Sequence, residues 1–277
     1  ANNMAISIMN EMIKNEDKKR ENETEEEIEN KSIEEIKQDC ELNASKRLLP
    51  KFRKRYPRLA IRIIGDSLYP CIGLIELCER EYMEYIFVLK DKKIPTLLTE
   101  FLTLVSLPSG NREVIENNEK IILTLWENNI DYKGKKINVI RQITKDKETG
   151  KCNKWMWITN REITRKNLYK IIYCAKLRDY IENQGFREQK VTSGIDLEHV
   201  YSKDIKAIEV IYTIIQITHL ILQIIEHSDI CGDFNKKYGS VKVFRRKFYA
   251  HLTETDINIE LIQIKIQIRF YKSLMIY

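Results

Sequence analysis

The clearest pattern of apolar and polar positions lies between residues 59 and 89. The β-branched run LAIRII (59–64) predicts a strand, the following apolar positions recur at helical spacing, and YIFVL (85–89) predicts a second strand. A helix between two buried strands is the unit of a parallel sheet. The turn GDS places Asp66 at the carboxyl end of the first strand, where open α/β sheets bind ligands. A structural alternative is that Asp66 and Ser67 cap the helix.

Upstream, the pattern predicts one strand, one charged segment and one helix. MAISIM (4–9) is short and apolar and predicts a strand, whereas residues 14–32 are almost wholly charged or polar and predict a solvated linker. Apolar spacing begins at Ile33 and predicts a helix. This helix ends near Pro50 or continues to Tyr56, because proline removes a backbone donor and crowds the preceding turn.

Downstream, the pattern changes twice. A helix and a loop are expected over residues 94–118, and β-formers with turn signals predict three or four antiparallel strands over residues 119–160. Thr164 is expected to cap a further helix. The most apolar stretch, residues 207–225, contains Glu, Gln and His and is interpreted as a core helix rather than a membrane span. The tail segment INIELIQIKIQIRFYKSL (257–274) is compatible with either strand or helix.

The helix that starts near Ile33 has a strongly basic second half. NASKRLLPKFRKRYPR (43–58) carries seven cations and no acid. Cations at a helix C-terminus complement the helix dipole, which is the structural alternative. The functional interpretation is contact with the phosphates of DNA. The predicted DNA-binding residues are Lys46, Arg47, Lys51, Arg53, Lys54 and Arg55.

Composition narrows the setting of these elements. The chain has 277 residues, 43% of them hydrophobic, which is enough for one large domain or two small ones. The formal net charge of +6 permits a polyanionic partner without requiring one. The six cysteines show neither a CxxC pair nor zinc-like spacing, so a reducing, cytoplasmic setting is expected. No signal peptide is recognisable at the N-terminus.

A second acidic position stands out in RDYIENQGFREQK (178–190), which follows the helix capped by Thr164. Arg178 and Glu182 are four residues apart and therefore neighbours on a helix. For such a segment alone, a solvated helix face is the simplest interpretation. However, the segment follows IGDSLY (64–69) and the predicted antiparallel strands. This order makes a functional role for Glu182 the better interpretation.

Taken in order, these segments resemble the catalytic domain of insertion-sequence DDE transposases that carry a β-strand insertion between their second and third catalytic acids. The resemblance covers residues 4–225 and rests on the ordered set of KQDCELNASKRL, IGDSLY, WITN with TRKNLY, and RDYIENQGFREQK followed by GIDLEHVYSKD. It implies an α/β ribonuclease H-like fold with a mixed sheet, an inserted antiparallel β-region and C-terminal helices. The implied division has four parts. They are the first part of the ribonuclease H-like domain (1–118), the insertion (119–160), the C-terminal helical part of that domain (161–228) and the tail (229–277).

The resemblance also implies roles for individual residues. Asp66 corresponds to the second catalytic acid and Glu182 to the third, and together they would bind a pair of Mg²⁺ ions. Arg178 and Lys190 correspond to the basic residues of the signature around that glutamate. Two departures are visible, because Ala175 replaces the usual tyrosine and Lys190 lies one position later than the commonest spacing. On an ideal α-helix Lys190 would lie about 80° from Glu182.

The first catalytic acid has no counterpart in the sequence, because no aspartate precedes Met4 and Asp17 and Asp39 fall in the linker and the next helix. The expectation is therefore a transposase fragment that is inactive alone. An intact enzyme would cleave and join DNA ends by two-metal phosphoryl transfer. Its expected partner is double-stranded DNA, with a possible homodimer and no membrane. The alternative is a non-catalytic DNA-binding or regulatory remnant.

Overall fold

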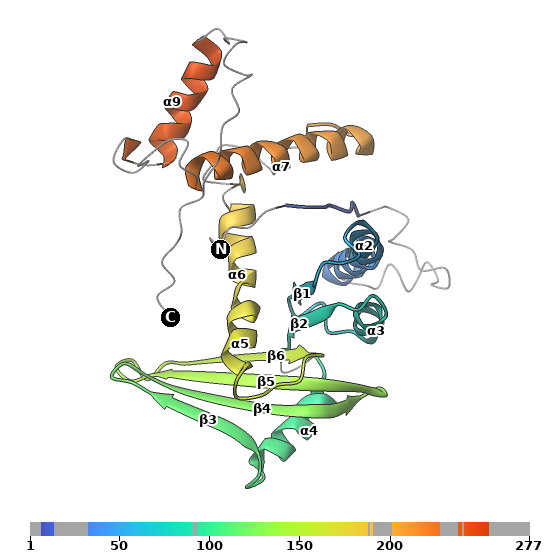
Figure 1. Cartoon of the computed structure of the whole chain (residues 1–277), viewed down its shortest axis with the longest axis vertical. Helices are drawn as coiled ribbons and strands as arrows, with labels where there is room; N and C mark the ends of the chain where they lie inside the picture. Colours follow the sequence, from blue (N-terminus) through green and yellow to red (C-terminus); the bar gives the residue numbers. More distant parts are fainter. Residues whose placement is uncertain are drawn as a thin grey trace. The chain divides into compact units, whose positions relative to one another are not determined.

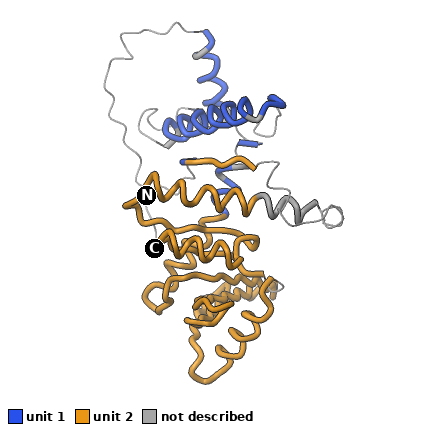
Figure 2. The backbone as a smooth tube through the Cα atoms, turned by 90° about the vertical axis from the view of Figure 1, so that its right-hand side faces the viewer, with its two compact units in different colours: residues 1–8, 179–277 blue, residues 9–178 orange. Residues whose placement is uncertain are grey.

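The computed structural model describes part of the chain in detail. The chain forms two compact units, residues 9–178 and residues 1–8 with 179–277 (Figure 2). The described residues are 7–13, 33–90, 93–187, 189–190, 201–227, 238–239 and 241–254.

A six-stranded mixed sheet forms the centre of the unit of residues 9–178. The strand order is β1-β2-β6-β5-β4-β3. β1 and β2 are parallel, and all other neighbours are antiparallel. The strands are β1 Arg62–Gly65, β2 Glu84–Val88, β3 Asn111–Glu116, β4 Lys120–Tyr132, β5 Lys135–Asp146 and β6 Cys152–Thr159. The fold of this unit is therefore mixed α/β.

The strands agree with the sequence pattern in kind and differ in detail. The strand–helix–strand unit is confirmed, and the antiparallel strands expected over residues 119–160 are β4, β5 and β6. β3 precedes them in a segment that was expected to be a loop. The antiparallel strands extend the sheet of β1 and β2, because Ile86 pairs with Thr159. The strand expected over residues 4–9 is wrong for residues 7–9, which have no regular structure, while residues 4–6 lie outside the described part.

Four helices accompany the sheet in the described part of this unit. α2 (Ile33–Arg55) continues through Pro50, so the longer of the two expected helices is the one observed. α3 (Ile72–Arg80) starts two residues after Pro70, directly after its N-cap residue Cys71. The other two helices are α4 (Pro95–Ser106) and α5 (Leu168–Lys176).

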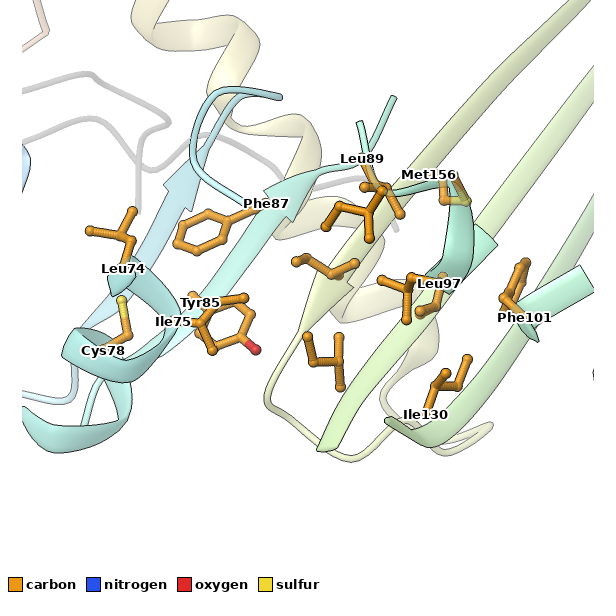
Figure 3. Close-up of a cluster of buried hydrophobic side chains, with 14 of the residues drawn as sticks. Leu74, Ile75, Cys78, Tyr85, Phe87, Leu89, Leu97, Phe101, Ile130 and Met156 are labelled. Carbon is orange, nitrogen blue, oxygen red and sulfur yellow. The ribbon is translucent and has the colours of Figure 1, made fainter. Parts of the chain in front are cut away.

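The larger hydrophobic core lies between α3, α4 and one face of the sheet (Figure 3). Leu74 and Cys78 of α3 pack towards β2, where the rings of Tyr85 and Phe87 stack with centroids 4.8 Å apart. Phe101 of α4 is buried in the same cluster. Burial of the Tyr85 ring and hydroxyl raises the pKa of that tyrosine. This core fixes β1 and β2 against α3.

A second core covers the opposite face of the sheet. Leu168, Ile171 and Ala175 of α5 pack against Trp157 of β6 and Ile140 of β5. Figure 1 shows α4 and α5 on opposite sides of the long strands β4 and β5. This second core therefore fixes the axis of α5, and with it the position of the residue that follows its C-terminal end.

The unit of residues 1–8 and 179–277 contains α7 (Ile205–His227) and α9 (Val241–Glu254). Residues 206–225 of α7 form a segment long and apolar enough to cross a membrane by length and composition. Only 11% of its most apolar window is buried, so within its own unit α7 is not the core helix that was expected. Its buried positions include the polar residues His219 and Gln223, while Ile214 is 57% exposed. Residues 255–277 of the tail lie outside the described part.

Gly65, the last residue of β1, precedes Asp66 and packs closely against two aromatic rings. A Cβ at this position would lie 2.7 Å from the ring of Tyr69 and 3.0 Å from the ring of Phe87. We expect Gly65→Ala to lower the free energy of unfolding by about 1–3 kcal/mol, because one of these rings must move. The matched control is Gly73→Ala in α3, whose Cβ would meet only Lys46, at 3.5 Å. Equal urea midpoints for the two variants would contradict this packing.

Glu84 joins β1 to β2 through a charge network. Arg62, its cross-strand partner, donates from Nε to Oε2 at 2.8 Å, and Arg161 donates to Oε1. Burial would raise the pKa of Glu84, but the hydrogen bonds and charges of Arg62 and Arg161 outweigh it and hold the pKa below its ordinary value of 4.5.

A carboxyl whose pKa is lowered on folding stabilises the fold above its ordinary pKa, and this contribution is lost as the pH falls through the lowered value. We therefore expect the stability difference between the wild type and Glu84→Gln to be largest above pH 4.5 and to shrink in more acidic buffer. Urea unfolding measured over a pH series tests this. A difference that stays constant across the series would show that the carboxylate charge contributes nothing.

Candidate functional site

Asp66 lies directly after β1, at the carboxyl end of the strand. Its Oδ1 accepts a hydrogen bond from the Leu68 amide at 2.8 Å, which closes the turn of residues 66–69. The N-cap of α3 is Cys71, so Asp66 does not cap that helix. The Asp66 side chain is 42% exposed, so its carboxylate is accessible to a ligand or a cation. Oδ2 is the oxygen that does not accept the Leu68 hydrogen bond.

Arg178 faces this carboxylate from the end of the helix that crosses the sheet. It follows α5 and opens the short helix α6 (Arg178–Tyr180). Its Nη2 lies 3.8 Å from Oδ2 of Asp66, and its side chain is 28% exposed. Two residues that are 112 positions apart in sequence thus meet because β1 and α5 are each held by a hydrophobic core. A guanidinium beside a carboxylate can orient that carboxylate or bind a phosphate next to it.

Tyr69 and Ser45 complete the surroundings of Asp66. The Ser45 hydroxyl donates to the Tyr69 hydroxyl at 3.3 Å, which links α2 to the turn after β1. Burial raises the pKa of Tyr69; the Ser45 hydrogen bond opposes the rise, and the charges of Asp66 and Glu41 add to it. Tyr69 was contained in the segment IGDSLY, but its contact with α2 could not be inferred from spacing.

Glu182 and Lys190 lie in the unit of residues 1–8 and 179–277. Glu182 is in η2 (Ile181–Phe186), a π-helix rather than the expected α-helix, and both side chains are exposed. π-helical turns are rare and are frequent at functional sites. The angle expected from ideal α-helical geometry therefore does not apply between Glu182 and Lys190. A metal pair shared by Asp66 and Glu182 stays a prediction.

Three of the predicted DNA-binding cations have partners within the fold. Glu11 accepts from Arg47 Nε at 3.0 Å and from Lys51 Nζ at 2.6 Å, and its own side chain is 8% exposed. Burial would raise the pKa of Glu11, but the hydrogen bonds and charges of Lys51 and Arg47 lower it overall. These two cations therefore hold residues 9–13 against α2.

Arg53 binds backbone carbonyls from two turns. Its Nε donates to the Glu81 carbonyl at 2.8 Å, its Nη2 to that of Tyr82 at 2.9 Å and its Nη1 to that of Leu59 at 2.9 Å. Tyr82 has a φ of 53°, in the left-handed region. Arg53 thus supports the turn between α3 and β2. Lys46, Lys54 and Arg55 are exposed on α2 and can reach a polyanion.

Comparison with known proteins adds no family assignment. No protein-family model matches the chain, and no curated protein is significantly similar to it. Functional conclusions therefore depend on the residues and their geometry.

Arg53 and Lys54 are adjacent cations with different roles in the structure. We expect Arg53→Ala to lower the free energy of unfolding by about 1–2 kcal/mol, because three backbone carbonyls lose a charged donor. Lys54→Ala removes the same charge from an exposed side chain and should change stability by less than about 0.5 kcal/mol. Urea denaturation of both variants makes the comparison. Equal losses would show that the carbonyl contacts of Arg53 do not stabilise the fold.

Proposed function

We propose that this chain is part of a nuclease-like phosphoryl-transfer enzyme of the DDE transposase type, with a ribonuclease H-like fold. The observation that carries the proposal is the contact between Asp66 and Arg178. It brings the carboxyl end of β1 to the end of the helix that leads into Glu182. In such a site Asp66 and Glu182 are the metal-binding acids, Arg178 orients the acid or a phosphate, and Lys190 contacts DNA.

The sheet supports the fold part of this proposal. β1 and β2 are parallel and joined by α3, and Asp66 follows the first of them. Four antiparallel strands then separate β2 from α5 in sequence, which agrees with an insertion between the second and third acids. The insertion continues the sheet, so it would extend the catalytic platform and not form a separate lobe.

The chemistry of the donor set also supports the proposal. Transfer at a phosphodiester needs charge stabilisation at both the attacking and the leaving oxygen, and two Mg²⁺ ions about 3.5–4 Å apart supply this when bound. Mg²⁺ prefers carboxylate and water oxygens. Oδ2 of Asp66 does not accept the Leu68 hydrogen bond, and the Glu182 side chain is exposed, so both acids offer oxygens of the required kind. Arg178 is placed to hold the carboxylate of Asp66 in one orientation.

The nucleic-acid part of the proposal depends on the exposed cations of α2. Lys46, Lys54 and Arg55 can contact the phosphates of double-stranded DNA. The fold uses Arg47, Lys51 and Arg53 in structural contacts, so the candidate surface on α2 is smaller than the sequence suggested. The proposal also includes a cytoplasmic location, action as a homodimer on DNA, and no membrane partner.

A second candidate function is a non-catalytic DNA-binding or regulatory protein. It is favoured by one observation: Lys46, Lys54 and Arg55 of α2 are exposed and can contact phosphates without any metal ion. In this case the exposed cations bind DNA, and Asp66 only shapes its turn and pairs with Arg178.

Binding of Mn²⁺, a paramagnetic substitute for Mg²⁺, distinguishes the two candidates. We expect electron paramagnetic resonance titration to show a site that both Asp66→Asn and Glu182→Gln weaken by roughly tenfold or more, because each removes a carboxylate ligand. The matched control is Asp179→Asn, an exposed acid close to Glu182 in sequence. Mn²⁺ affinity that is unchanged by both substitutions, or changed by only one, would contradict the catalytic proposal. DNA binding without any Mn²⁺ site would support the second candidate.

A further inference from the structure

A pocket of about 240 Å³ lies at the point where β2 ends beside β6. Its floor is apolar, because Leu89 and Met156 are buried and lie side by side (Figure 3). The Leu89 amide donates to the Met156 carbonyl at 2.9 Å, which fixes the end of β2 to β6. The pocket therefore lies where the end of β2 is hydrogen-bonded to β6.

Three cations line this floor from three different segments. Lys90 follows β2, Arg141 is on β5 and Lys154 is on β6. Arg141 is the register partner of Met156. Because side chains alternate along a strand, Arg141, Met156 and Lys154 point to the same face of the sheet. Lys90 and Lys154 are exposed and Arg141 is half-buried, so the charges stand at the rim above the apolar floor.

No ion pair among the described residues neutralises these charges. Among the residues that the structure describes, no carboxylate forms an ion pair with Lys90, Arg141 or Lys154, and no acid lines the pocket. Like charges gathered at one pocket repel each other and attract an anion. The contrast with Arg47 and Lys51, which share the carboxylate of Glu11, indicates that these three cations serve an external partner.

The size and the lining of the pocket restrict the partner. Pockets for whole small molecules usually measure about 300–1,000 Å³, so this one suits a part of a larger ligand. Trp155 also lines it, but its ring stacks on Trp157 with an interplanar angle of 3°, and Trp157 belongs to the core on the opposite face. The pocket therefore offers positive charge, an apolar floor and the partly exposed ring of Trp155.

We propose that Lys90, Arg141 and Lys154 bind a backbone phosphate of a nucleic-acid strand that passes over the end of β2. The apolar floor of Leu89 and Met156 accommodates the adjoining sugar. This site depends on the proposed nucleic-acid function, but not on the metal chemistry of Asp66 and Glu182. It extends the contact surface from α2 to the sheet itself.

The test measures DNA binding by the full chain. Fluorescence anisotropy of a short labelled duplex reports the affinity at a series of salt concentrations. We expect the triple variant Lys90→Gln, Arg141→Gln, Lys154→Gln to bind roughly tenfold more weakly, because a charge-assisted phosphate contact is lost. The slope of log affinity against log salt should also fall by about 1.

A matched control removes the same charge elsewhere on the sheet. The variant Arg112→Gln, Lys133→Gln, Lys136→Gln changes three exposed cations outside the pocket. It should retain both the affinity and the salt slope of the wild type. A further variant, Lys90→Arg, Arg141→Lys, Lys154→Arg, keeps every charge. It should retain most of the wild-type affinity for DNA.

Three results would overturn the proposal. The first is equal binding by the pocket variant and the wild type, and the second is an equal loss in the pocket and control variants, which would indicate general charge effects. The third is measurable affinity of the pocket for inorganic phosphate or a mononucleotide alone, lost in the pocket variant, which would assign it to a small free anion. These substitutions should leave Mn²⁺ binding at Asp66 unchanged, so failure here is distinguishable from failure of the catalytic proposal.

Discussion

The parallel pairing of β1 with β2 is the constraint on which the rest of the site depends. A parallel pair requires a crossing connection, and α3 supplies it by burying its apolar face on β2. The chain therefore leaves β1 at Gly65 with no room for a side chain against Tyr69, and the next residue, Asp66, turns out of the sheet. Packing of α5 on the opposite face then brings Arg178 to that carboxylate. The position of Asp66 is thus a consequence of two hydrophobic cores.

The described cations of α2 and of the pocket at the end of β2 fall into two groups with different physical roles. Those of the first group are used within the fold: Arg53 binds carbonyls of two turns, and Arg47 with Lys51 holds Glu11. The second group remains exposed on α2 or gathers at the end of β2. A net charge of +6 does not distinguish these groups, because only tertiary contacts show which charges are neutralised.

The sequence allowed prediction of those features that depend on neighbours in the chain. The β-branched runs predicted β1 and β2, and turn signals predicted the antiparallel strands, whose turns do contain left-handed Gly134 and Gly150. The contact partners of Arg53 could not be predicted, because Glu81 and Tyr82 are nearly 30 positions away and supply backbone atoms. β3 was missed because its exposed, charged sequence resembles a loop until β4 pairs with it. The contact between Ser45 of α2 and Tyr69, in the turn after Asp66, could not be predicted either, because the two residues are 24 positions apart.

The central proposal is that Asp66 and Glu182 share one metal site. A crystal structure of the full chain grown with Mn²⁺, in which anomalous scattering locates the ions, tests it most directly. The account predicts that both carboxylates contact the same ion or a pair of ions about 3.5–4 Å apart. A separation of the two carboxylates beyond roughly 12 Å would contradict it, because no such ion pair could join them.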